Sequence, residues 1–363
     1  MTTNAVNSAV FAFPVNITLE TIEPFFREIF QKVEEKNLKE VIINFNDFIS
    51  SNGRVEPIAT LRTANNIEAF KRFYGDRVTL KRYYSEATLL SNTYARTMRV
   101  FSLFNIPFGD SYKDDFNPNF FGKRTYIPLI LKNLQENVSE SLFIEDDIDK
   151  ISKYMANILT MSSGNENVKN YFSYSLNELI RNIIEHSDSR SLMCMAQEWA
   201  GQGGRCIEVG IMDLGQGIHK SLEEKMNLID DKSISPLQLA LLPGASSKVT
   251  TYVKDDADNS GFGLYMISEI VRKNGEFFVF SGNQGYTVFN DNDEFLECHT
   301  LGTLIGIKLY IDNLSDYELE LEALRKQGLT RRILTEQFFQ RARFSPGIPI
   351  DWSQLFQKEF SDV

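Results

Sequence analysis

The sequence predicts an α/β protein of α+β character, with two domains and a helical C-terminal extension. Three observations support this fold class. Apolar patterns typical of strands and helices alternate over residues 1–107, amphipathic helices and an alternating strand recur over residues 150–312, and 363 residues are enough for two hydrophobic cores. Residues 108–149 are predicted to connect the two domains, and residues 313–363 to form the extension.

The first domain is predicted to be a small α/β unit in which strands and helices alternate. Strands are expected at residues 10–15, 41–45 and 78–81, and helices at residues 19–35, 58–73 and 87–104. Strands separated by helices usually pair in parallel, so we expect a largely parallel sheet. Residues 109–122 are rich in Asp, Asn, Pro and Phe, which is typical of a linker.

The second domain is predicted to contain a helix at residues 175–186, where apolar side chains recur with the spacing of one buried face. Glu178 and Asn182 stand four residues apart on its polar face, so their side chains share the same space. A carboxylate can hold and deprotonate a water or hydroxyl, and an amide oxygen binds Mg²⁺ without adding charge. The pair is a candidate for nucleotide chemistry; the alternative is a solvated helix face.

Asp213 ends a predicted strand at residues 205–213 and falls on the apolar side of that strand. A carboxylate buried there costs roughly several kcal/mol unless a donor meets it. The exocyclic amino group of an adenine is one such donor. Gly215 and Gly217 follow at once and would let the backbone approach a ligand closely. An ordinary turn at the strand end is the alternative.

Gly261 and Gly263 precede a predicted amphipathic helix, in which Leu264 is a packing residue. Free N–H groups at such a helix start suit phosphate oxygens. The preceding stretch, residues 243–259, is long and polar and predicts a lid, in which Lys248 is a candidate phosphate contact.

These motifs resemble, in order and spacing, those of the GHKL ATPase superfamily, which includes gyrase, Hsp90, histidine kinases and MutL. The matching residues are Glu178 and Asn182 (N box), Asp213, Gly215 and Gly217 (G1 box), Gly261, Gly263 and Leu264 (G2 box), and Gly302 and Thr303. The phrases "NELIRNIIEHS" and "SGFGLYMISEIVRKNG" are most similar to stand-alone bacterial ATP-binding proteins related to anti-sigma-factor kinases. The resemblance implies a Bergerat-fold α/β sandwich, a mixed sheet with helices on one face and ATP between sheet, helices and lid.

The resemblance also implies roles for these residues. Glu178 would polarise the attacking water or hydroxyl, Asn182 would bind Mg²⁺, and Asp213 would bind the adenine amino group. Thr303 would support Asp213 through water, and the four glycines Gly215, Gly217, Gly261 and Gly263 would shape the pocket and cradle phosphates.

The sequence departs from the family in two ways, and each makes one activity of the family unexpected for this chain. The histidines are His186, His219 and His299, all inside the matching region, so a histidine autokinase is not expected. No transducer lysine of the gyrase and MutL type is identifiable, which argues against efficient independent hydrolysis.

The N-terminal pattern resembles STAS domains, the fold of anti-sigma-factor antagonists, through "LKEVIINFNDFISSNG". Ser50 and Ser51 lie near the position of the family's phosphoacceptor, but Asn52 and a missing aspartate depart from its motif. A docking domain without a phosphorylation switch is the favoured alternative.

Composition excludes several classes of protein. A net charge of −11 and a pI near 5.0 argue against binding nucleic acid through phosphate neutralisation. No apolar run spans a bilayer and no signal peptide is recognisable, so we expect a cytoplasmic protein without a membrane partner. Cys194, Cys206 and Cys298 are expected to be reduced. Two C-terminal helices, at residues 316–326 and 330–344, carry a basic face that is either solvated or a dock.

The predicted function is that of an ATPase or an anti-sigma-type serine/threonine kinase with ATP and Mg²⁺ as cofactors and Glu178 as base. The alternative is a nucleotide-switched interaction protein, in which ATP orders the lid and controls partner binding with little turnover. A protein encoded by a neighbouring gene and a second copy of this chain are the candidate partners.

Overall fold

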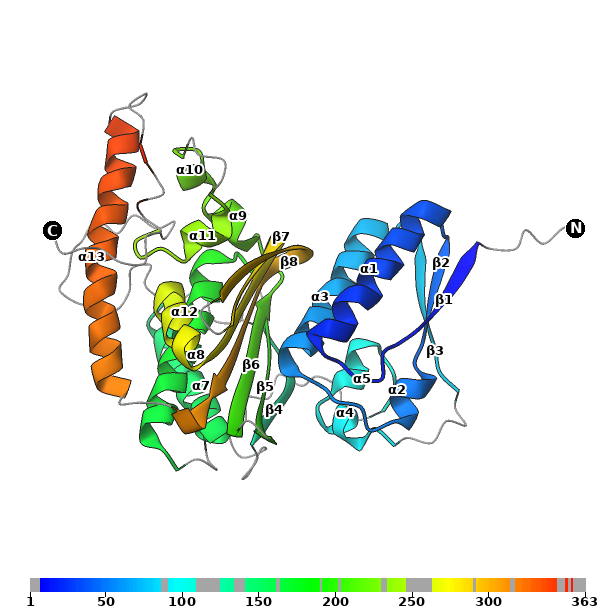
Figure 1. Ribbon diagram of the computed structural model, residues 1–363. Coiled ribbons are helices and arrows are strands. Elements are labelled where there is room, and N and C mark those ends of the chain that lie inside the picture. The colour runs from blue at the N-terminus through cyan, green and yellow to red at the C-terminus, as the bar shows by residue number, and fades with distance from the viewer. Residues whose placement is uncertain are drawn as a thin grey trace, which may run out of the picture.

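The computed structural model describes residues 7–85, 91–108, 125–133, 141–160, 164–189, 191–201, 204–229, 234–245, 263–289, 292–313, 317–344, 350–351 and 354. The protein is mixed α/β, with a parallel sheet of three strands and a separate antiparallel sheet of five. Figure 1 shows that helices lie between the two sheets and also cover the far face of the larger one.

The smaller sheet has the strand order β1-β2-β3 and is parallel, as predicted. Its strands are β1 (Ser8–Ala12), β2 (Glu40–Asn44) and β3 (Thr79–Tyr83), and its helices include α1 (Leu19–Lys36), α2 (Asn46–Ser50) and α3 (Pro57–Tyr74). Strand β2 is central because it pairs with both β1 and β3, and its alternate residues Val41 and Ile43 are buried.

The helix predicted at residues 87–104 is wrong as a single element. Residues 86–90 lie outside the described chain, and two short helices follow, α4 (Thr93–Thr97) and α5 (Val100–Leu103). Helix α4 begins at Asn92, whose side chain accepts a hydrogen bond from the Ala95 N–H at 2.9 Å. Arg99 has a φ of +61°, a left-handed conformation that no continuous helix contains.

The larger sheet has the strand order β4-β5-β6-β8-β7. Its strands are β4 (Tyr126–Asn133), β5 (Ser191–Gly201), β6 (Gly204–Asp213), β7 (Gly275–Phe289) and β8 (Asn292–Tyr310). We expected a mixed sheet, but every pairing among these strands is antiparallel, because β5 with β6 and β7 with β8 form hairpins. Residues 108–149 were predicted to be a connecting segment, but they contain β4, which is a strand of the larger sheet.

One face of the larger sheet packs against helices and forms the core of this part of the protein. These helices are α7 (Ser141–Thr160), α8 (Glu166–His186) and α12 (Gly263–Asn274), and short helices α9 (Gly217–Ser221), α10 (Glu223–Met226) and α11 (Pro236–Ala240) lie beyond the end of β6. Helix α8 has the predicted buried stripe, with Leu176, Leu179 and Ile180 at most 1% exposed.

Helix α3 of the N-terminal domain covers the opposite face of the larger sheet and contacts β5, β6 and β8. Residues 57–67 of this helix are all buried, so its N-terminal part has no solvated face. Gly210 and Gly306 are paired across β6 and β8, and a Cβ at either would lie 2.7 Å from Leu61 Cδ1 or 2.6 Å from Ile58 Cδ1, respectively. The two glycines therefore let α3 approach the sheet closely.

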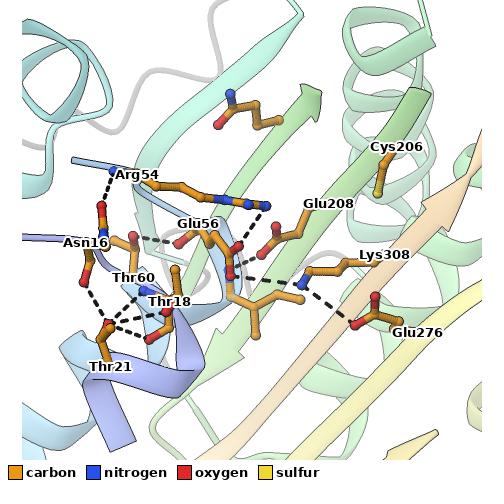
Figure 2. A network of polar contacts seen from close by, with 12 residues as sticks. Asn16, Thr18, Thr21, Arg54, Glu56, Thr60, Cys206, Glu208, Glu276 and Lys308 are labelled. Carbon is orange, nitrogen blue, oxygen red and sulfur yellow. Dashed lines mark hydrogen bonds and ion pairs between the residues drawn. The ribbon is translucent and has the colours of Figure 1, made fainter. Parts of the chain in front are cut away.

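Charged side chains lie at the end of this contact (Figure 2). Glu208 is fully buried, and its Oε1 accepts a hydrogen bond from the Ile58 N–H at 3.0 Å, at the start of α3. Lys308 lies 3.9 Å from Glu56 Oε2 and 3.7 Å from Glu276 Oε2. Burial of these groups requires the two domains to be in contact.

The C-terminal extension contains one long helix, α13 (Tyr317–Phe344), where we predicted two. Gly328 lies inside it at a cost of roughly 1 kcal/mol, which packing on α8 and α12 offsets. Phe338 and Phe339 share a hydrophobic cluster with Leu222, Leu239 and Leu242. The three cysteines are free thiols, and no described helix is long and apolar enough to cross a membrane.

Candidate functional site

A cavity opens where β6 and β8 meet the helices α8, α9 and α12. Six residues singled out in the sequence line it: Asn182, Asp213, Gly217, Gly263, Leu264 and Thr303. The structure therefore brings together side chains and glycines that are up to 121 positions apart (303 − 182).

Asp213 is the buried carboxylate of this cavity and is only 2% exposed. It ends β6 opposite Thr303 of β8, and its Oδ1 accepts a hydrogen bond from the Gly215 N–H at 2.7 Å. Burial raises its pKa to about 7, and hydrogen bonds from the backbone of Gly215 and Thr303 partly oppose this shift. A ligand that donates to this carboxylate would stabilise its ionised form.

Glu178 and Asn182 lie on consecutive turns of α8 and reach the start of α12. Gly263 is the first residue of α12, and a Cβ there would overlap Glu178 Oε2. Only glycine allows the carboxylate to lie so close to this helix start. Asn182 and Gly263 line the cavity, whereas Glu178 is not among its lining residues and lies next to it through Gly263.

Sequence reasoning missed Ser281, which lies on β7 opposite Thr303. Its hydroxyl donates to the Gly302 carbonyl at 2.9 Å and accepts from the Ile218 N–H at 2.8 Å, so it ties α9 to β8 beneath the cavity. A single serine within a strand has no spacing that would have indicated this role.

The apolar part of the cavity was also missed. Ile183, Ile218 and Ile305 line it together with Leu222 and Leu264. Branched aliphatic walls beside one buried carboxylate suit a flat, largely apolar ring that carries a hydrogen-bond donor.

Several predicted residues cannot be placed in the cavity. Lys248, Gly261 and residues 246–259 of the predicted lid lie outside the described residues, as does the side chain of His186. In the N-terminal domain Ser50 is exposed at the end of α2, where its hydroxyl donates to the Asn46 carbonyl at 2.8 Å. Ser51 donates to the Phe48 carbonyl at 3.3 Å.

Mg²⁺ fits this donor set only in partnership with a phosphate ligand. Among the described residues no three His, Cys, Asp or Glu side chains gather as a metal group, and Asn182 offers a single neutral oxygen. Mg²⁺ commonly keeps several waters and binds through one or two protein oxygens and substrate phosphates. Asn182 would supply one such oxygen.

Comparisons with protein-family models, with curated proteins and with solved structures found no match to this chain.

Proposed function

We propose that this protein binds ATP in the cavity at the end of β6 and hydrolyses it, or transfers its γ-phosphoryl group, in a regulatory role. The observation that carries the proposal is the carboxylate of Asp213, buried at the cavity wall among aliphatic side chains. An adenine ring would pack on those side chains, and its amino group would donate to the carboxylate. The phosphates would then extend toward the start of α12.

The reacting end of the nucleotide would meet Glu178 and Asn182. Asn182 would hold Mg²⁺ together with phosphate oxygens, and the ion would neutralise charge on the phosphates. Glu178 would orient an attacking water, or the hydroxyl of an acceptor side chain, and take its proton. This assignment agrees with the GHKL resemblance, under which the larger domain is a Bergerat fold and the N-terminal domain a STAS-like module.

A nucleotide-switched interaction protein is the second candidate. One observation favours it: the N-terminal domain makes buried hydrogen bonds to β8 immediately before Gly302 and Thr303. Nucleotide binding is then coupled to the docking of a whole domain, whether or not ATP is turned over.

Titration of the purified protein with Mg²⁺-ATP, followed by a phosphate-release assay, tests the proposal. We expect wild type to bind ATP. Glu178→Ala should bind it about as tightly but lose turnover by about 10² or more, the usual scale for a lost general base.

The matched control is Glu166→Ala, on the same helix with a side chain that is 75% exposed, which should resemble wild type in both assays. No ATP binding by wild type would refute the proposal. Binding without turnover, in wild type and Glu178→Ala alike, would leave the switch as the function.

A further inference from the structure

The Asn65 side chain of helix α3 forms two hydrogen bonds with the backbone of Leu301 in β8, as the backbone of a neighbouring strand would. The Asn65 side chain donates to the Leu301 carbonyl at 2.7 Å and accepts from the Leu301 N–H at 3.1 Å. Asn65 is 0% exposed, so its side-chain amide is shielded from water at this contact. Such a fully satisfied buried amide fixes the relative position of the two segments.

The backbone N–H and C=O of Leu301 can bond to Asn65 because neither β6 nor β7 pairs with Leu301. Strand β7 pairs Ser281 with Thr303 and then Gly282 with Thr300, and the pairing of β6 with β8 ends at Asp213 and Thr303. Leu301 and Gly302 therefore have no ladder partners on either side. Buried backbone groups need partners, and Asn65 supplies both for Leu301.

The peptide that Asn65 holds lies directly against the site carboxylate. Gly302 has a φ of +64°, and a Cβ on it would lie 2.7 Å from Asp213 Oδ1. The same Asn65 Nδ2 also lies 3.4 Å from the sulfur of Met212, the residue before Asp213. Asn65 thus contacts the residues that precede both Gly302 and Asp213.

Arg62 strengthens the same contact one turn earlier on α3. Its guanidinium is buried and donates to the His299 carbonyl at 3.0 Å and to the Thr300 hydroxyl at 2.8 Å. Glu23 of α1 pairs with the same guanidinium, so α1 supports the contact that Arg62 makes with residues 299 and 300.

We infer that Asn65, supported by Arg62, is a positioning residue for the nucleotide site, through which the N-terminal domain sets the affinity of that site for a purine nucleotide. The inference rests on the proposed function. Asn65 touches no ligand; it holds the Leu301–Gly302 peptide, and so Thr303, against Asp213. Because coupling between two sites is reciprocal, bound nucleotide should in turn stabilise the contact of α3 with β8.

Calorimetric titration of Asn65→Ala and Asn65→Leu with Mg²⁺-ATP tests this inference, well below the melting temperature of each variant. Leucine keeps the side-chain volume but makes neither hydrogen bond, so it serves if alanine weakens folding. Both variants should bind ATP about tenfold or more weakly, within the usual range of coupling between sites. Asn66→Ala is the matched control. The neighbouring asparagine is also buried, and within the part of the chain that the structure describes its Nδ2 has no hydrogen-bond partner, so this substitution should leave the affinity for ATP unchanged.

Hydrogen exchange of the wild-type protein adds a measurement that needs no variant. Saturating ATP should slow exchange of the Leu301 amide. Asn65 variants with wild-type ATP affinity, or a Leu301 amide indifferent to ATP, would overturn the inference while the proposed function stood. Failure of wild type to bind ATP would overturn both.

Discussion

Asp213 and Glu208 are two of the buried carboxylates of the described chain, and their surroundings give them different roles. Burial raises the pKa of both Asp213 and Glu208 to about 7. Asp213 lines a cavity, where a ligand can supply a donor. Glu208 lies in the contact between α3 and β6, where its Oε1 accepts from the Ile58 N–H and its Oε2 has no hydrogen-bond partner among the described residues. Only Asp213 is therefore a candidate binding residue, whereas Glu208 affects folding stability.

The raised pKa of Glu208 determines how the free energy of unfolding depends on pH. Glu208 has a pKa raised from 4.5 to about 7 by burial, opposed by Lys308 and reinforced by Glu56. Between these two values the folded protein binds more protons than the unfolded chain, so the free energy of unfolding falls as pH rises from about 4.5 to 7.

Glu208→Gln should therefore stabilise the protein at pH 8, because the amide still accepts the Ile58 N–H and carries no charge. The expected gain in unfolding free energy is about 1–3 kcal/mol, since one pKa unit corresponds to roughly 1.4 kcal/mol. At pH 4.5 the gain should vanish. Urea unfolding at both pH values measures it, with the exposed Glu224→Gln as control. An identical gain at both pH values would show that the Glu208 charge is not responsible.

At the scale of elements, the approach of α3 to the larger sheet depends on shape. A Cβ on Gly306 would lie 2.6 Å from Cδ1, 2.8 Å from Cγ1 and 3.0 Å from Cγ2 of Ile58, so the whole side chain would have to move. At Gly210 the nearest atom is only the terminal Cδ1 of Leu61 at 2.7 Å, which can shift more easily. Gly306 is therefore the tighter position.

Gly306→Val should destabilise the protein by about 1–3 kcal/mol through overpacking, although valine favours strands elsewhere. Ile58→Ala alone should cost about 2–5 kcal/mol by leaving a cavity. Combined, the two changes should cost less than the sum by at least about 1 kcal/mol, because valine fills the space that isoleucine leaves. Chemical denaturation of all three variants gives the coupling, and strict additivity would mean that α3 does not pack here.

The sequence predicted those features that depend on local periodicity. Alternation placed Asp213 on the apolar side of its strand, where it is buried, and helical spacing placed Glu178 and Asn182 on one side of α8. Residues that meet only through tertiary packing were not predictable. Asn65 contacts Leu301 across 236 positions, and a polar helical residue usually indicates a solvated surface.

The breaks between helices were predicted poorly for a related reason. We predicted two helices in the C-terminal extension, at residues 316–326 and 330–344, but contacts of α13 with α8 and α12 accompany one continuous helix. Arg99 gave no signal, yet its left-handed backbone ends α4 and begins α5. In both cases packing outweighs intrinsic propensity.

For the whole molecule, the larger sheet and the helices that carry the candidate site lie between α13 and the N-terminal elements (Figure 1). The N-terminal domain packs behind the site, and its core merges with the outer face of the larger sheet through Met212, Phe280 and Leu304. Helix α13 packs beside it, because Leu222 both lines the cavity and contacts Phe338 and Phe339. A ligand bound at the proposed nucleotide site would therefore lie against elements that contact both terminal parts.

The central claim is that Asp213 binds the amino group of adenine, and its most direct test varies the two partners together. Wild type and Asp213→Asn are titrated calorimetrically with Mg²⁺-ATP and with purine riboside triphosphate, which lacks only the 6-amino group. We predict that wild type prefers ATP by about tenfold or more, or roughly 1.4 kcal/mol. Asp213→Asn should bind both nucleotides weakly and without preference. Equal binding of the two nucleotides by wild type, or unchanged ATP affinity in Asp213→Asn, would contradict the account.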